Sequence, residues 1–147
     1  MTDSKVERQA LRQHFRQQRN HLTDLQQEQS SEHCLQVCLQ SGLLEGISVL
    51  AAYLANDGEL NPCEIIQHCC QHKIEVLLPV LHPTHPGHLV FVHYREDSIL
   101  QPNKFGIPEP IATEHNIVAL ENIDLIFTPL VAFDIKGNRL GMGGGLL

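Results

Sequence analysis

The chain has 147 residues, 42% apolar and 18% charged, which suits a single globular domain with one hydrophobic core. Its net charge of −7 argues against general nucleic-acid binding, because a phosphate backbone requires a broad basic face. No apolar run is long enough to span a membrane, no signal peptide is evident and the five cysteines form no CxxC pair, so we expect a cytoplasmic protein with reduced thiols.

The first predicted element is a helix over residues 3–20. Four arginines recur along one stripe of it, at helical spacing: Arg8, Arg12, Arg16 and Arg19. An apolar stripe lies directly beside them: Leu11, Phe15 and Leu22. The arginines should therefore border the core, where a cleft could bind one polyphosphate; a solvated charged face is the open alternative.

A second helix is predicted from a capping box, with Thr23 as N-cap and Gln26 three residues later, and it should end at Ser41 and Gly42. Cys34 and Cys38 lie on its apolar side. A metal pair is possible there, but two small apolar residues in a core are favoured.

Strands and helices are predicted to alternate along the rest of the chain. The apolar runs 47–53, 74–79 and 89–94 have the length of buried strands, and a further strand lies within 124–133. A third helix should begin at Asn61, and residues 111–120 are assigned a short helix. This pattern predicts one α/β domain over residues 1–147, a three-layer α/β/α sandwich with a mostly parallel central sheet.

Three histidines, His82, His85 and His88, occur between two predicted strands. Prolines within this run exclude a helix, so the spacing does not place the imidazoles on one face. A solvated loop is favoured over a metal site.

The candidate site lies at the strand exits, where ligands of open α/β sheets bind. The segment 136–145 combines glycines with Arg139, and such a loop can hold a phosphate through backbone N–H groups and a guanidinium; a flexible tail is the alternative. Glu59 follows the strand 47–53, so we expect it to share a cleft with Arg139. Phe105, in the proline-stiffened loop 104–110, either walls a pocket or belongs to a simple crossover.

The chain resembles the 5-formyltetrahydrofolate cyclo-ligase family from about Lys5 to Gly145. The resemblance is carried by residues 129–134 followed by 137–145, by Tyr53-Leu54 with Gly58-Glu59-Leu60, by the Gly106-Ile107-Pro108-Glu109-Pro110 loop, and by the basic N-terminal helix. The glycine motif in this order is specific, and the four matches occur in the order of the family.

The resemblance implies that ATP, with Mg²⁺, phosphorylates the formyl oxygen of 5-formyltetrahydrofolate. N10 then attacks the activated carbon and phosphate leaves, giving 5,10-methenyltetrahydrofolate and ADP. By position, Glu59 and Arg139 would be catalytic, and Leu54, Glu59 and Phe105 would contact the folate. The resemblance assigns nucleotide binding to Arg8, where the family usually has lysine, and to Arg12, Arg139, Leu140, Gly141, Met142, Gly143, Gly144, Gly145, Leu146 and Leu147.

The match also has a departure. After Gly145 the family expects an aromatic pair and then an aspartate that helps to hold Mg²⁺, whereas Leu146 and Leu147 stand here. We therefore expect a truncated, monomeric member with little activity. The alternatives are a non-catalytic nucleotide- or folate-binding remnant, and a different α/β protein that holds a monophosphate, such as a sugar-phosphate isomerase.

Overall fold

The computed structural model describes residues 2–142, with side chains from Ser4 onward. Its helices are α1 (Thr2–Asn20), α2 (Asp24–Gln40), α3 (Cys63–Gln71) and the 3₁₀ helix η1 (Leu120–Asn122). The central sheet contains β1 (Val49–Ala51), β2 (Glu75–Leu81), β3 (Leu89–Tyr94), β6 (Ile117–Val118) and β7 (Leu125–Ile126). Two small hairpins complete the fold: β4 (Leu100–Pro102) with β5 (Pro108–Pro110), and β8 (Ala132–Phe133) with β9 (Arg139–Leu140).

The helix boundaries follow local signals. The predicted capping box is confirmed: Thr23 Oγ1 accepts the Gln26 N–H at 3.1 Å, and Gln26 Oε1 accepts the Thr23 N–H at 2.9 Å. Just beyond the other end of α2, Gly42 has φ +74°, a left-handed conformation that favours glycine. The N-cap of α3 is Pro62, one residue later than the predicted Asn61, and it makes no side-chain cap bond; Asn61 Oδ1 accepts the Cys63 N–H at 3.0 Å from the preceding turn.

The α/β class is confirmed, and the strand order in the central sheet is β6-β3-β2-β1-β7. β1 runs parallel to β2 and β7, whereas β3 runs antiparallel to β2 and β6, so the sheet is mixed. The reason for the antiparallel pair is the short link 82–88, since a parallel pair requires a crossover of a dozen or more residues.

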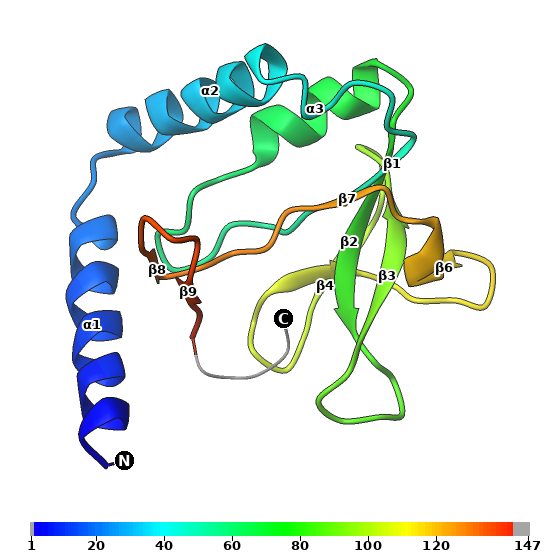
Figure 1. Cartoon of the computed structure of the whole chain (residues 1–147). Coiled ribbons are helices and arrows are strands. Elements are labelled where there is room, and N and C mark those ends of the chain that lie inside the picture. Colours follow the sequence, from blue (N-terminus) through cyan, green and yellow to red (C-terminus); the bar gives the residue numbers. More distant parts are fainter. Residues whose placement is uncertain (1, 143–147) are drawn as a thin grey trace.

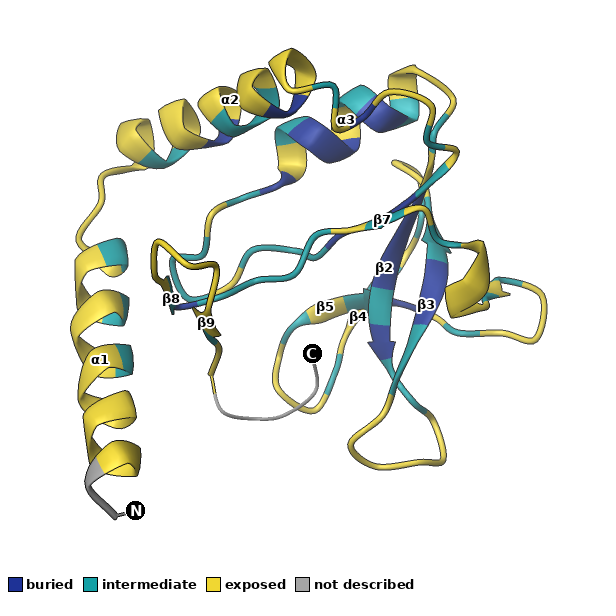
Figure 2. Cartoon of the chain, in the orientation of Figure 1, coloured by how far each residue is buried: buried dark blue, intermediate teal, exposed yellow. Residues whose placement is uncertain are grey.

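One face of the sheet is covered by α2 and α3 (Figures 1 and 2). Their contact with the sheet forms the main core: Cys38, Leu44, Leu50, Ala52, Ile65, Ile66, Cys69, Val76 and Leu78. Cys38 is only 5% exposed, so the interpretation of this cysteine as a core residue is confirmed.

The other face has a smaller core cluster in which Ala51, Leu77 and Phe91 pack against Val118 and Ile123, among others. The helix predicted over residues 111–120 is wrong, because residues 111–116 form a loop, which is followed by β6 and the start of η1.

The side chain of Asn116 explains that loop. It accepts the Thr113 N–H at 2.7 Å and donates to the Ile111 carbonyl at 2.8 Å, and such bonds compete with helical ones.

Helix α1 stands apart from the sheet (Figure 1). Leu11 remains 48% exposed and Phe15 36% exposed, so the expectation that the arginine stripe borders the hydrophobic core is wrong. The stripe instead faces the loop after β1 and the β8–β9 hairpin. Among the described residues, no helix is long and apolar enough to cross a membrane.

Candidate functional site

A cavity of about 210 Å³ opens at the carboxyl ends of β1 and β2. Its walls are mainly apolar, with a few polar groups at the rims, which is the usual character of a small-molecule site. The lining residues are Tyr53, Leu54, Asn56, Glu59, Leu78, Pro79, Leu81, Leu89, Asn103, Phe105, Ile107, Pro108, Glu109, Pro129 and Met142.

The structure brings together the three residues predicted to contact an organic substrate. Leu54 and Glu59 come from the loop after β1, and Phe105 comes from the β4–β5 connection. Met142, predicted as part of the nucleotide segment, also lines this cavity. The chain folds this way because the strand exits meet at one edge of the sheet.

Glu59 is half-buried at the rim. Its Oε1 atom accepts the Asn56 N–H at 2.9 Å, which fixes the carboxylate in the loop. Burial raises the pKa of Glu59, an effect that the Asn56 hydrogen bond and the charge of Arg19 oppose. Beside it, the Tyr53 hydroxyl donates to the Leu60 carbonyl, and burial, aided by the Glu59 charge, raises the pKa of Tyr53 to about 12.

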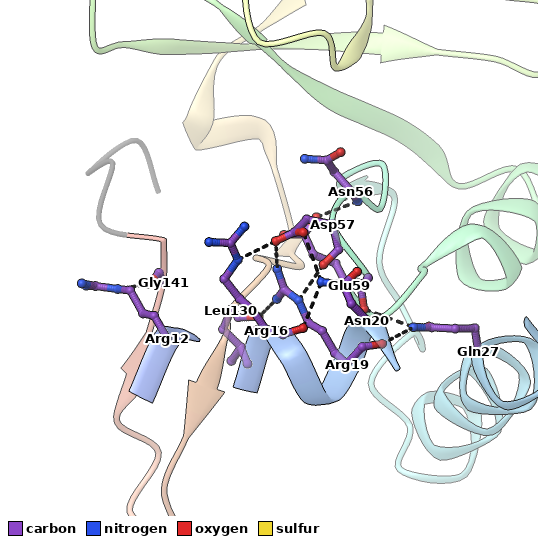
Figure 3. Close-up of polar contacts among 11 residues, drawn as sticks. Arg12, Arg16, Arg19, Asn20, Gln27, Asn56, Asp57, Glu59, Leu130 and Gly141 are labelled. Carbon is purple, nitrogen blue, oxygen red and sulfur yellow. Dashed lines mark hydrogen bonds and ion pairs between the residues drawn. The ribbon is translucent and has the colours of Figure 1, made fainter. Parts of the chain in front are cut away.

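The loop that carries Glu59 is tied to α1 through Asp57 (Figure 3). Asp57 Oδ2 lies 2.7 Å from Arg16 Nε and 3.1 Å from Arg19 Nη2, and Asp57 Oδ1 accepts from Asn20 Nδ2 at 3.2 Å. The hydrogen bond from Arg16 is the main reason that the pKa of Asp57 falls to about 2. Next in the chain, Gly58 has φ +74°, and a Cβ there would meet Asn20 Oδ1 at 2.7 Å, so the close approach requires glycine.

Arg19 also joins the loop to the segment after β7. Its Nε donates to the Asp57 carbonyl at 2.7 Å and its Nη1 to the Leu130 carbonyl at 3.3 Å. Arg16 and Arg19 therefore have a structural role at the site. Of the arginine stripe, only Arg8 and Arg12 remain to bind an anionic ligand.

Of those remaining arginines, Arg12 lies against the predicted nucleotide segment. Its Nε donates to the Gly141 carbonyl at 2.8 Å, a contact between positions 129 residues apart (Figure 3). Arg8 is exposed one turn earlier on α1, and its side chain makes no hydrogen bond or ion pair within the described residues.

The first part of the glycine segment is a hairpin turn and not an open anion cradle. The Asp134 carboxylate accepts the N–H groups of Lys136 and Asn138, each at 2.9 Å, and Gly137 takes φ +85° in the turn. These N–H groups are already occupied, so the interpretation of residues 136–138 as part of a phosphate loop is corrected. Gly141 has no left-handed φ, and Gly143, Gly144, Gly145, Leu146 and Leu147 lie outside the described residues.

Arg139 sits on β9, paired with Phe133, and its Nη1 donates to Thr128 Oγ1 at 2.7 Å. It is exposed and is not one of the residues that line the cavity, so the described structure does not bring it into the cavity with Glu59. Its neighbours Pro129 and Met142 do reach the cavity wall, which places Arg139 beside the site rather than within it.

The described part of the chain contains no group of three or more His, Cys, Asp or Glu residues arranged to hold a metal ion. The loop of His82, His85 and His88 is largely exposed, and the His82 and His85 rings pack edge to face, 4.5 Å apart. The Mg²⁺ implied by the resemblance would be held mainly by the phosphates of ATP and one or two carboxylates, an arrangement that does not require such a group.

Sequence reasoning missed two polar residues of the cavity, Asn103 and Glu109. Glu109 Oε2 accepts the Leu81 N–H at 3.2 Å and also accepts from Asn103 Nδ2 at 3.2 Å. Glu109 stands inside the Gly-Ile-Pro-Glu-Pro motif that carried part of the resemblance, so its position was visible in the sequence, but its partners were not.

The fold and the cavity define a small-molecule-binding α/β protein, with cationic side chains grouped beside the cavity rather than inside it. The sequence profile of the 5-formyltetrahydrofolate cyclo-ligase family matches residues 4–147. The chain belongs to this family.

Individual relatives agree with the family match. The 5-formyltetrahydrofolate cyclo-ligase of Haemophilus influenzae is 42% identical over 138 residues, which cover 94% of this chain and 74% of the relative. The Escherichia coli K12 protein of the same name is 37% identical over 131 residues, which cover 89% of this chain and 72% of the relative.

Solved structures show the same fold. The 5,10-methenyltetrahydrofolate synthetase of Aquifex aeolicus superposes with a TM-score of 0.78 at 25% identity, covering 92% of this chain and 67% of that one. The Mycoplasma pneumoniae synthetase superposes with a TM-score of 0.70 at 19% identity, covering 95% and 73%, and supports the fold alone.

Proposed function

We propose that this chain catalyses the ATP-dependent cyclisation of 5-formyltetrahydrofolate to 5,10-methenyltetrahydrofolate, with release of ADP and phosphate. The observation that carries the proposal is the meeting of Leu54, Glu59 and Phe105 around one cavity, in a member of the cyclo-ligase family. We further propose that the protein is a monomer and that it works in the cytoplasm; the five free thiols support the cytoplasmic location.

The chemistry of the cavity supports binding of the bicyclic ring of a reduced folate. Apolar walls from Leu54, Leu78 and Phe105 suit the faces of its planar pyrimidine half, and the Glu59 carboxylate can accept hydrogen bonds from its N–H groups. The described lining residues include no lysine, arginine or histidine, so a phosphate would be repelled there. The electrostatics therefore favour the bicyclic ring inside the cavity and the phosphates of ATP beside it, next to the arginines.

Glu59 is proposed to orient the folate. One of its oxygens already accepts the Asn56 N–H, and the other accepts no hydrogen bond from the described residues. Because burial makes the carboxylate less hydrated, a ligand N–H that donates to it replaces the missing water. Such a bond would fix the ring next to the reacting formyl group.

The phosphates of ATP are proposed to bind along α1 and β9. Arg8 and Arg12 on α1 and Arg139 on β9 supply positive charge, and the hydrogen bond from Arg12 to Gly141 links the two elements. Leu140 and Gly141, with Met142, Gly143, Gly144, Gly145, Leu146 and Leu147, complete the proposed nucleotide segment. When bound, ATP supplies the phosphoryl group that activates the formyl oxygen, and the arginines would stabilise charge on that group as it transfers.

The activity is tested directly with the purified chain, MgATP and 5-formyltetrahydrofolate, by following the absorbance of the methenyl product. Calorimetry with each ligand alone tests binding separately from turnover. Formation of the product at a rate proportional to enzyme supports the proposal. If the chain fails to bind ATP or fails to bind 5-formyltetrahydrofolate, the proposal is refuted.

The division of roles is tested with matched variants. Glu59→Gln should raise the Kd for the folate about tenfold and leave the Kd for ATP unchanged, since it removes a charge from the cavity. Arg139→Ala should do the reverse. Glu114→Gln and Arg95→Ala, at exposed positions away from the cavity, serve as controls for the loss of each charge. Equal effects of Glu59→Gln and Arg139→Ala on both ligands would contradict the assignment.

A further inference from the structure

The connection between β4 and β5 carries Phe105, and one side chain, that of Asn103, shapes it. Asn103 Oδ1 accepts the N–H groups of Phe105 at 2.8 Å and Ile107 at 3.2 Å. Two backbone hydrogen bonds also cross the turn: the Asn103 N–H donates to the Ile107 carbonyl, and the Asn103 carbonyl accepts from the Gly106 N–H, each at 2.9 Å. The turn is therefore closed around Asn103.

Glu109 anchors this turn to the central sheet. β1 pairs with β2 only over Glu75–Leu77. Along the rest of β2, the edge that faces β1 therefore has no strand partner within the described chain. Pro79 has no N–H to satisfy there, and the N–H of Leu81 is taken by Glu109 Oε2. The same oxygen accepts from Asn103 Nδ2. One carboxylate oxygen thus joins the edge of the sheet to the turn.

Phe105 itself has little packing to hold it. Its side chain is 61% exposed although it lines the cavity, and the nearest cation, Lys104 Nζ, lies 5.1 Å from the ring centroid. Its placement at the cavity therefore depends on the polar chain from Leu81 through Glu109 to Asn103.

We propose that Glu109 is a positioning residue for ligand binding: acting through Asn103, it holds Phe105 against the cavity before the ligand arrives, and so sets the affinity for a flat ring. The identity of that ring as a reduced folate rests on the proposed function, but the positioning itself does not. A preordered wall increases affinity because less side-chain freedom is lost on binding.

Phe105→Trp provides a direct probe, because the chain contains no tryptophan. In this background, Glu109→Ala removes the anchor. Glu109→Gln keeps a carbonyl oxygen that can accept from Leu81 and Asn103. Asn103→Asp keeps the acceptor for the turn but replaces the donor to Glu109 with a carboxylate oxygen that repels it, so it breaks that link and leaves the hydrogen bonds of the turn in place. Glu114→Ala is the control for an exposed glutamate.

The first readout is the fluorescence anisotropy of the introduced indole without ligand. We expect lower anisotropy with Glu109→Ala and with Asn103→Asp, and an unchanged value with Glu109→Gln and Glu114→Ala. Circular dichroism and Tm establish that each variant is folded; if Glu109→Ala is not, Asn103→Asp carries the test. Unchanged anisotropy in the folded anchor-breaking variants would overturn the proposal.

The second readout is calorimetry in the chain with Phe105 intact. Glu109→Ala should weaken 5-formyltetrahydrofolate about tenfold and leave ATP unaffected, and Glu109→Gln should restore affinity to within about threefold. Equal weakening of both ligands would show a general structural defect and overturn the proposal. If the unmodified chain binds no folate, the proposed function fails, while the ligand-free anisotropy still decides the role of Glu109.

Discussion

The salt bridges at Asp57 make a quantitative prediction about stability. Asp57→Asn removes the charge that faces Arg16 and Arg19 but retains a side chain of the same shape. It also suits the backbone, because Asp57 has φ +53° and asparagine tolerates the left-handed region. The variant therefore isolates the electrostatic contribution from any backbone strain.

The magnitude follows from the pKa. A fall from 3.8 to about 2 corresponds to about 2.4 kcal/mol at 1.36 kcal/mol per unit. Water screens this pair, since the Arg16 side chain is 43% exposed and that of Asp57 29%, so we expect a loss of about 1 kcal/mol in the free energy of unfolding. Because the folded pKa is the lower one, this stabilisation is complete above about pH 4 and disappears as the pH falls toward 2.

The assay is urea unfolding followed by circular dichroism, with the original chain and the variant compared at pH 7 and pH 3. The difference between them should be about 1 kcal/mol at pH 7 and about half of that at pH 3. Subtracting the unfolding free energy of the variant from that of the original chain cancels the titration of every other carboxyl group. An equal difference at both pH values would refute the electrostatic explanation.

Three further predictions concern the fold. Thr23→Ala removes the capping bond to Gln26 and should lower the unfolding free energy by about 1 kcal/mol in urea; no change would mean that the box is not formed in solution. Leu50→Ala truncates a side chain with 0% exposure in the main core between the sheet and the helices and should cost about 2–5 kcal/mol in the same assay, so a loss below about 1 kcal/mol would contradict the packing. Burial raises the pKa of the Cys69 thiol to about 11, so at pH 8 a disulfide reagent should label exposed Cys63 first and Cys69 only on unfolding; equal rates in the native protein would contradict its burial.

Much of the local structure could be read from short-range patterns. Thr23 and Gln26 predicted the start of α2, and the apolar run Leu89–Tyr94 coincides with β3. Both signals act within a few residues, because a cap bonds to the next turn and a strand depends on its own side-chain pattern. The direction of β3 relative to β2 is not encoded in the apolar pattern of β3 itself. It depends on the length of the link between the two strands.

The site was predictable only in part, for the same reason. The family motifs located Leu54, Glu59 and Phe105, which line one cavity, but gave no indication that Glu109 bonds to Leu81 from 28 residues away. Such a bond exists only once the hairpin and the sheet are placed together.

The sequence by itself determined α1, α2 and α3, four of the five strands of the central sheet (β1, β2, β3 and β7), the α/β class and the family. Only the tertiary structure divided the arginine stripe of α1: Arg16 and Arg19 bind Asp57, whereas Arg12 donates to the Gly141 carbonyl. It also showed that Arg139, on β9, donates to Thr128. The physical reason is that arginines on one stripe of an isolated helix are equivalent. Their roles diverge when each meets a different partner, up to 129 residues away, as the chain packs.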